Sequence, residues 1–154
     1  MVGLTALTER AREARNAGFS IALCHGCFDL FHVGHVHHLN RAAELADVLI
    51  VSVSSDEACR KGPGRPVYRS EDRTALVAAL EMVDHAHTAR GRGPMDVIRA
   101  VRPDIYVKGP DYATRPCVRV RAEAALVERL GGRIAFTDAE ITASSTEILR
   151  RAHG

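Results

Sequence analysis

A strand, a glycine-containing turn and the start of a helix follow one another between residues 19 and 46, and this succession constrains the fold more than any other feature. Residues 19–23 form a short apolar run of the kind that makes a buried strand. From about Val36 onwards, apolar residues recur three and four positions apart, which is helical spacing. Residues 24–35 between them read Cys-His-Gly-Cys-Phe-Asp-Leu-Phe-His-Val-Gly-His. We therefore expect a strand, a turn and a helix, with His32 and His35 at the point where the helix begins.

This turn has the chemistry of an anion site. The first backbone N–H groups of a helix have no intrahelical partners and carry partial positive charge, so they attract anions. Gly34 has no Cβ, which lets a phosphate group approach the backbone closely. The imidazoles of His32 and His35 flank this glycine and can donate hydrogen bonds to phosphate oxygens. The stretch is therefore predicted to bind a phosphate group that takes part in a reaction.

Strand-like and helical segments alternate along the rest of the chain. Further strands are expected at 48–53, 86–89, 104–108 and 133–136. Helices are expected at 4–14, from 36, at 70–82, 94–103 and 123–130, and from Ser144 or Ser145 onwards, whereas glycine and proline make 61–69 a loop. This alternation predicts a parallel sheet with right-handed crossovers, in which ligands bind beyond the carboxyl ends of the strands.

Length and charge limit the class of protein. At 154 residues the chain is expected to be a single domain, residues 1–154. The net charge of +2 argues against a large nucleic-acid-binding face, and no apolar run approaches the roughly 20 residues that a membrane span needs. The first residues include Glu9 and Glu13 and lack the apolar core of a signal peptide. We therefore expect a cytoplasmic protein without membrane or nucleic-acid partners, whose 4 cysteines are reduced thiols.

Residues 32–35, His-Val-Gly-His, resemble the HxGH signature of the nucleotidyltransferase superfamily. The longer stretch 26–35 resembles the small cytidylyltransferase-like branch and is far more specific than HxGH alone, and the resemblance extends over roughly residues 20–150. It implies an α/β fold, a Rossmann-like three-layer sandwich with a mostly parallel five-stranded sheet. It also implies transfer of a nucleoside monophosphate from a nucleoside triphosphate to a phosphorylated acceptor, with release of pyrophosphate. Mg²⁺ is expected as the cofactor, because close anionic phosphate oxygens need a counter-ion.

Two later segments indicate a branch within this superfamily. Residues 108–112, Lys-Gly-Pro-Asp-Tyr, resemble the KGGDY segment of heptose 1-phosphate adenylyltransferases, and 144–146, Ser-Ser-Thr, resemble the closing STT-type motif. Glycerol-3-phosphate cytidylyltransferases have an arginine before that motif, and none aligns within 139–143 here, which favours the heptose-type branch. That branch would have glycine at position 110 and threonine at 145, so the acceptor can differ.

The resemblance also implies roles for individual residues. His32, His35 and Lys61 are the predicted catalytic residues, which position the triphosphate and neutralise its charge. The predicted nucleotide-binding residues are Gly26, Cys27, Phe28, Asp29, Gly34, Arg73, Lys108, Gly109, Ser144, Ser145 and Thr146. Asp111 and Tyr112 are predicted to bind the acceptor, and no side chain is predicted to ligate a metal. The expected substrates are ATP and D-glycero-D-manno-heptose 1-phosphate, in carbohydrate biosynthesis, and a homodimer is expected.

Other functions stay open at this stage. CTP could replace ATP, with glycerol 3-phosphate or another polyol phosphate as the acceptor. Adenylylation of flavin mononucleotide is a third possibility within the same class. A module that binds nucleotide or a partner without turnover is the alternative from a different class, and pyrophosphate release distinguishes it from the enzymes.

Structural roles also stay open for several of these residues. Asp29 can hold the turn through backbone hydrogen bonds, and Arg73 can pair with an acidic neighbour on the surface. Residues 144–146 can be a simple helix cap. Cys24 and Cys27 have the C-x-x-C spacing of a zinc site, but a second pair is missing. The arginines of the loop 109–121, namely Arg115, Arg119 and Arg121, can line an acceptor pocket or face water.

Overall fold

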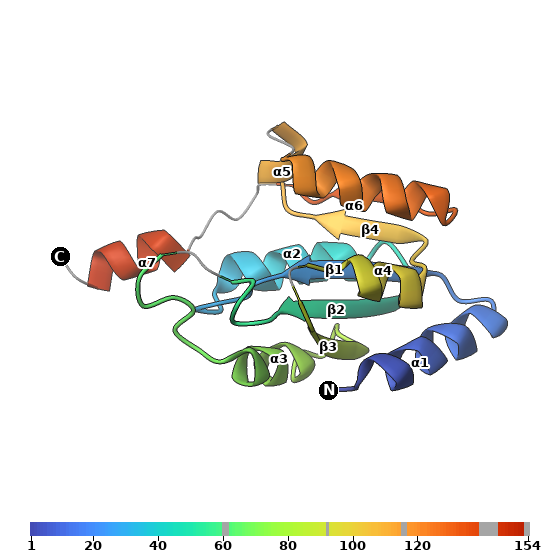
Figure 1. Cartoon of the computed structure of the whole chain (residues 1–154), viewed down its shortest axis with the longest axis horizontal. Coiled ribbons are helices and arrows are strands. Elements are labelled where there is room, and N and C mark those ends of the chain that lie inside the picture. The colour runs from blue at the N-terminus through green and yellow to red at the C-terminus, as the bar shows by residue number, and fades with distance from the viewer. Residues whose placement is uncertain (60–61, 92, 115–116, 139–144, 153–154) are drawn as a thin grey trace.

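Five strands form one sheet in the computed structural model, which describes residues 1–59, 62–91, 93–114, 117–138 and 145–152 (Figure 1). The strands are β1 (Ile21–Gly26), β2 (Val48–Ser54), β3 (His85–Ala89), β4 (Ile105–Lys108) and β5 (Arg133–Phe136). Their order is β3-β2-β1-β4-β5, and every neighbouring pair is parallel. The predicted α/β fold is therefore confirmed, and its five-stranded sheet is entirely parallel.

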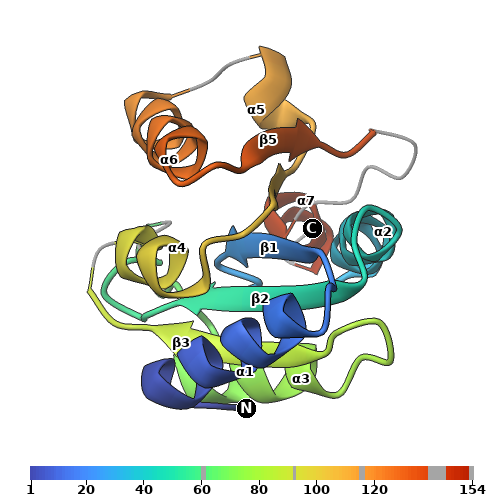
Figure 2. The same ribbon diagram turned by 90° about the vertical axis from the view of Figure 1, so that its right-hand side faces the viewer.

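Helices cover both faces of this sheet. One face packs against α1 (Leu4–Asn16), α4 (Met95–Val101) and α6 (Val118–Arg129), and the other against α2 (Val33–Ala43) and α3 (Ser70–Ala78). Figure 2 shows α4 and α6 on one side of the strands and α2 on the other. Successive β1 residues feed the two cores alternately, as the strand pleat requires: Ile21 and Leu23 join the first, Ala22 and Cys24 the second. None of the described helices is long and apolar enough to cross a membrane.

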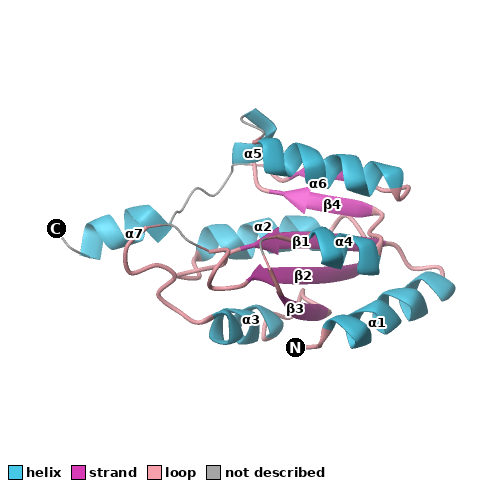
Figure 3. Cartoon of the chain, viewed as in Figure 1, coloured by secondary structure: helices cyan, strands magenta, loops and turns pink. Residues whose placement is uncertain are grey.

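The carboxyl ends of the strands lie at one edge of the molecule, to which the arrowheads of β1, β2 and β4 point in Figure 3. From β1 the chain moves outward to β2 and β3, and then crosses back to place β4 on the other side of β1. The strand order therefore reverses between β1 and β4, and in open parallel sheets ligands bind at such a switch point. α2 begins just after β1, and α5 (Asp111–Thr114) just after β4. The last helix, α7 (Ser145–Ala152), lies beyond this edge in Figure 1.

Several predicted boundaries were wrong. Phe19 lies before β1 and is 52% exposed, so the strand begins at Ile21. α2 begins at Val33 with His32 at its N-cap, as expected for these histidines, so its first turn precedes the apolar spacing that the sequence shows from Val36.

Three other helices also differ from the prediction. α3 ends at Ala78 instead of Met82, and its N-cap is Arg69 rather than Ser70. α6 begins at Val118, five residues before the predicted start, and the predicted loop after β4 contains α5. Arginines interrupt the apolar pattern at the start of α6, so the spacing of apolar residues did not indicate a helix there.

Candidate active site

His32 and His35 are brought together at the N-terminus of α2, as predicted. His32 is the N-cap residue and His35 lies three residues later, and their rings stack with centroids 3.8 Å apart and an interplanar angle of 22°. The backbone N–H of His32 donates to Nδ1 of His35 at 3.4 Å. A neutral imidazole that accepts at Nδ1 carries its proton on Nε2. Nε2 of His35 is therefore a hydrogen-bond donor at the helix N-terminus, where anions are favoured.

The turn before α2 supports these rings. Phe28 and Leu30 have positive φ angles of 52° and 49°, which non-glycine residues adopt only at a cost of about 1 kcal/mol each. The Phe28 side chain is buried and lies 5.3 Å from the His35 ring, and Phe31 stacks on the same ring at 5.2 Å. A Cβ at Gly26 would meet the Phe28 ring at 3.0 Å, so a side chain there would displace this support. The turn therefore holds the orientation of His35 through aromatic packing.

Asp29 holds a neighbouring loop against this turn. Its carboxylate accepts hydrogen bonds from Nε of Arg65 at 2.6 Å and from the backbone N–H groups of Val67 and Tyr68. Burial alone raises the pKa of Asp29, but the bonds from Arg65 and the two amides outweigh it and leave the pKa below its ordinary value. Both side chains of the Asp29–Arg65 pair are almost fully buried. The structure therefore favours the turn-holding role that the sequence left open.

Arg73 is fully buried beneath the same turn. Its guanidinium donates to the carbonyl oxygen of Cys27, to that of Tyr68 at 2.9 Å and to Oδ1 of Asp56 at 2.6 Å. The alternative in which Arg73 pairs with an acidic neighbour on the surface is therefore wrong. Arg73 thus connects the turn after β1, the segment after β2 and the loop before α3. We expect it to support nucleotide binding indirectly, by positioning this turn.

Lys108, at the end of β4, belongs to a buried polar cluster on the face of the sheet that α6 covers, opposite to the face that α2 covers. Its Nζ lies 3.3 Å from Oε2 of Glu123, and the Tyr106 hydroxyl donates to the same oxygen at 2.8 Å. Lys108 and Glu123 are only 6% and 1% exposed, and Nζ also lies 4.9 Å from the centre of the Tyr112 ring. The ammonium group is therefore already neutralised within the protein, and direct binding of nucleotide by Lys108 stays a prediction. Sequence reasoning missed Glu123, because an isolated glutamate in a helix carries no motif.

Two of the cysteines are not thiols. Cys27 and Cys59 form a disulfide with their Cα atoms 5.5 Å apart, whereas Cys24 and Cys117 are free. The thiol prediction is thus wrong for this pair, because the sequence could not show that the segments after β1 and β2 meet. Burial raises the pKa of the Cys24 thiol to about 12, which makes it unreactive, and with Cys27 bonded elsewhere the two do not form a zinc site.

The other predicted residues are distributed along the same edge or lie outside the described part of the chain. Gly34 is in the first turn of α2, and Gly109 follows β4 directly. Asp111 and Tyr112 are exposed in α5. Lys61 and Ser144 lie outside the described residues, while Ser145 and Thr146 begin α7 with side chains that the structure does not describe.

The described residues offer no group of three or more His, Cys, Asp or Glu side chains placed to hold a metal ion. Asp29 is the acidic residue of the signature turn, residues 27–32 between β1 and α2, and its carboxylate accepts hydrogen bonds from Arg65 and two backbone amides. The Asp29 carboxylate is therefore already engaged by the protein and is not placed to hold a divalent metal.

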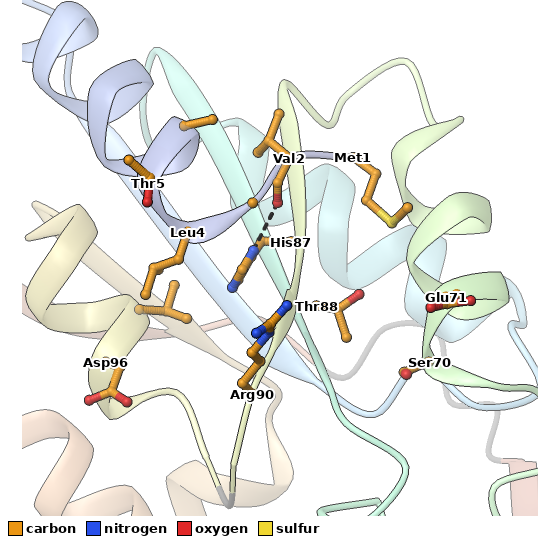
Figure 4. A pocket seen from close by; sticks show the side chains of 13 residues that line it. Met1, Val2, Leu4, Thr5, Ser70, Glu71, His87, Thr88, Arg90 and Asp96 are labelled. Carbon is orange, nitrogen blue, oxygen red and sulfur yellow. Dashed lines mark hydrogen bonds between the residues drawn. The ribbon is translucent and has the colours of Figure 1, made fainter.

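A cavity of about 840 Å³ lies away from these residues, beneath the N-terminal segment (Figure 4). The carbonyl oxygen of Val2, in its wall, is hydrogen-bonded to Nδ1 of His87. The wall also includes Glu71, Arg90 and Asp96. No predicted site residue lines this cavity. The candidate active site is thus the edge at the switch point and not this larger space.

His25, beside the signature turn, makes the fold sensitive to acid. Burial, together with the charges of Lys108 and Arg119, lowers its pKa from 6.5 to about 3, and its ring nitrogens bond to the hydroxyls of Ser52 and Ser54. The unfolded chain takes up this proton below about pH 6.5, but the folded chain does so only near pH 3, so acidification favours unfolding in this window. We expect His25 to account for a loss of roughly 2 kcal/mol in unfolding free energy between pH 6.5 and 5.

Urea denaturation of the wild type and of His25→Gln at both pH values measures this contribution. The variant should show a smaller difference between the two pH values than the wild type. Equal differences would contradict the assignment to His25.

Comparisons with known proteins agree with this geometry. The family model described as cytidylyltransferase-like matches residues 23–151, which include the signature turn, the sheet from within β1 onwards and most of α7. The chain belongs to the cytidylyltransferase-like family. The resemblance inferred from the HxGH stretch is thereby confirmed.

Relatives of this cytidylyltransferase-like chain include the "Bifunctional protein HldE" of Vibrio atlanticus (strain LGP32), 38% identical over 156 residues. The match covers 100% of this chain and 32% of that relative, so the chain spans about a third of its length. The protein of the same name from Syntrophotalea carbinolica is 38% identical over 139 residues, covering 89% of this chain and 28% of the relative. A solved structure, the lipopolysaccharide core biosynthesis protein from Thermoplasma volcanium GSS1, superposes with a TM-score of 0.64 at 28% identity, covering 77% of this chain and 94% of that one.

Proposed function

We propose that this protein is a nucleotidyltransferase that transfers AMP from ATP to a phosphorylated sugar and releases pyrophosphate. A phosphate oxygen of the acceptor attacks the α-phosphorus of ATP, and the bond from that phosphorus to the bridging α–β oxygen breaks. The products are an ADP-linked sugar and pyrophosphate. The observation that carries this proposal is the stacked pair His32 and His35 at the N-terminus of α2, at the switch point of a cytidylyltransferase-like chain.

The proposed catalytic role of these residues is electrostatic. The reaction moves negative charge from the attacking oxygen to the leaving pyrophosphate, so fixed donors around the phosphates lower its barrier. Nε2 of His35 and the backbone N–H groups of α2 are such donors, and His32 and Lys61 complete the proposed catalytic set. Asp29, Arg65 and Arg73 hold the turn that presents the histidines.

D-glycero-D-manno-heptose 1-phosphate is the proposed acceptor. The resemblance of 108–112 to the KGGDY segment supports it, together with relatives named HldE that match the whole chain and a solved neighbour titled as a lipopolysaccharide core biosynthesis protein. CTP with a polyol phosphate is the alternative within the class. We further propose that Mg²⁺ arrives with the triphosphate as part of the substrate, and that the protein is a cytoplasmic homodimer.

The test is pyrophosphate release with each of ATP, CTP, GTP and UTP, crossed with a panel of phosphorylated acceptors in the presence of magnesium. The panel contains heptose 1-phosphates, hexose 1-phosphates, glycerol 3-phosphate and flavin mononucleotide. Release with ATP and a heptose 1-phosphate is the expected result. Release only with CTP and a polyol phosphate would keep the reaction type and overturn the substrates. Triphosphate binding without release for any acceptor would contradict the enzymatic proposal.

A further inference from the structure

A second, smaller cavity opens between α4 and α6 at the same edge of the sheet as the candidate active site. Its volume is about 280 Å³, and its wall includes Arg90, Gly93, Asp96, Arg119 and Glu123. This volume is near the lower limit for small-molecule sites, and it suits a monosaccharide better than a whole nucleoside triphosphate. The cavity lies on the opposite face of the sheet from α2, so a ligand within it would approach the histidine pair from across the ends of the strands.

Glu123, a residue of this wall, has one carboxylate oxygen that lacks a partner among the described residues. Glu123 is 1% exposed, and while its Oε2 accepts from the Tyr106 hydroxyl at 2.8 Å and lies 3.3 Å from Lys108 Nζ, its Oε1 is buried without a hydrogen-bond partner among the described residues. A buried acceptor left unpaired is costly, and native proteins seldom keep one without a reason. Oε1 therefore requires a donor that the described part of the chain does not supply.

The surroundings indicate what kind of donor fits. The negative charge of Glu123 is already balanced by Lys108, and Arg119 makes no hydrogen bond or ion pair with another described residue. Arg90 is a second cation in the wall, while Asp96 is paired with Arg99 at 3.1 Å. A cationic ligand would be repelled by this excess of positive charge, whereas an anionic ligand would be attracted. The fitting ligand thus has a negative group and a neutral hydroxyl donor, as a phosphorylated sugar has.

We propose that this cavity is the acceptor subsite, in which Glu123 Oε1 accepts a hydrogen bond from a hydroxyl of the sugar phosphate. Arg119 at the wall attracts its phosphate, which points towards the strand ends and the histidine pair. Glu123 is thus a specificity-determining residue that touches the part of the acceptor away from the reacting phosphate. This inference rests on the proposed function, since it assigns the acceptor of that reaction to a place.

The experiment measures binding and turnover separately. Calorimetric titration with D-glycero-D-manno-heptose 1-phosphate, and with its analogues that each lack one hydroxyl, compares the wild type with Glu123→Gln. The matched control is Glu128→Gln, which makes the same charge change on an exposed position of the same helix. In the Glu123→Gln variant the amide oxygen must face the donors Tyr106 and Lys108, so an NH₂ group takes the place of the acceptor Oε1. ATP affinity is measured alongside as a check that each variant is folded.

We expect Glu123→Gln to weaken binding of the heptose phosphate about 10- to 100-fold, and Glu128→Gln to leave it within twofold. Loss of a negative charge would by itself favour an anion, so a weakening has to come from the hydrogen bond. One deoxy analogue should show the same loss with the wild type and no further loss with Glu123→Gln. Unchanged affinity in Glu123→Gln, an identical deoxy profile for both proteins, or no binding to the wild type would each overturn the proposal.

Pyrophosphate release with ATP separates this proposal from the proposed function. Release by the wild type with an acceptor KM unaffected by Glu123→Gln would keep the enzyme and remove this subsite. Sugar phosphate binding that depends on Glu123, without any pyrophosphate release, would keep the subsite and remove the reaction.

Discussion

Replacing His35 by alanine is expected to lower kcat for pyrophosphate release by two to three orders of magnitude. Nδ1 of His35 accepts the His32 amide, which places the proton on Nε2 and makes this nitrogen the donor to the phosphates. Loss of one fixed donor to charge that develops in a transition state typically costs roughly 100- to 1,000-fold in kcat. Single-turnover and steady-state measurements of pyrophosphate release, with the substrates that prove active, give this value.

Two further variants make the result specific. His35→Gln keeps an N–H group near the position of Nε2 and should retain more activity than His35→Ala. His37→Ala is the matched control. His37 lies just after the first turn of α2, and its Nε2 is hydrogen-bonded to Asp138 at 2.6 Å, so this variant should reduce kcat by no more than a few fold. His32→Ala should reduce kcat as strongly as His35→Ala. Full activity in both His32→Ala and His35→Ala would rule out the proposed mechanism.

Replacing Arg73 by methionine is expected to lower the free energy of unfolding by about 3 kcal/mol, because it leaves buried carbonyl groups without a donor. The carbonyl oxygens of Cys27 and Tyr68 would lose their bonds to the guanidinium. The pair with Asp56 adds less, since the Asp56 side chain is 47% exposed and partly screened by water. Denaturant unfolding at constant redox conditions measures the change.

Arg69→Met is the matched control for this prediction. It removes the same charge four residues earlier, at an exposed position, and should change stability by less than about 0.5 kcal/mol. Arg73→Met should also reduce turnover, since the turn that presents His32 and His35 would lose one of its supports. Wild-type stability in Arg73→Met would show that the buried guanidinium does not hold the turn.

The elements that could be predicted are those whose signal is local. The apolar run of β2 and the glycine turn before α2 predicted the start of each element to within about three residues, because burial on both faces and helical spacing depend on neighbouring residues. The predicted boundary was wrong where polar residues interrupt the apolar pattern. α6 begins with Val118 and Val120 separated by arginines, so its first turn carries no apolar stripe.

The arrangement of the site could be predicted only where its residues are close together in the sequence. His32 and His35 are three positions apart, and the structure confirms that they meet. Most partners of Asp29, Arg73 and Lys108 are distant in sequence: Glu123 lies 15 residues from Lys108, and Cys27 lies 46 residues from Arg73. Such contacts depend on the order of the strands and on the crossing helices, which spacing along the chain does not encode. The Cys27–Cys59 pair was missed for the same reason.

The central place of β1 has a consequence for how the protein is made. β1 pairs with β2 on one side and with β4 on the other, through the register Ala22–Ile105 to Cys24–Val107. A chain growing from its N-terminus completes β1 at residue 26 but β4 only at residue 108, 82 residues later (108 − 26). At the usual speed of synthesis this takes roughly 4 to 16 seconds. During that time one side of an apolar strand is an unpaired template for other chains, so the nascent protein needs protection until β4 emerges.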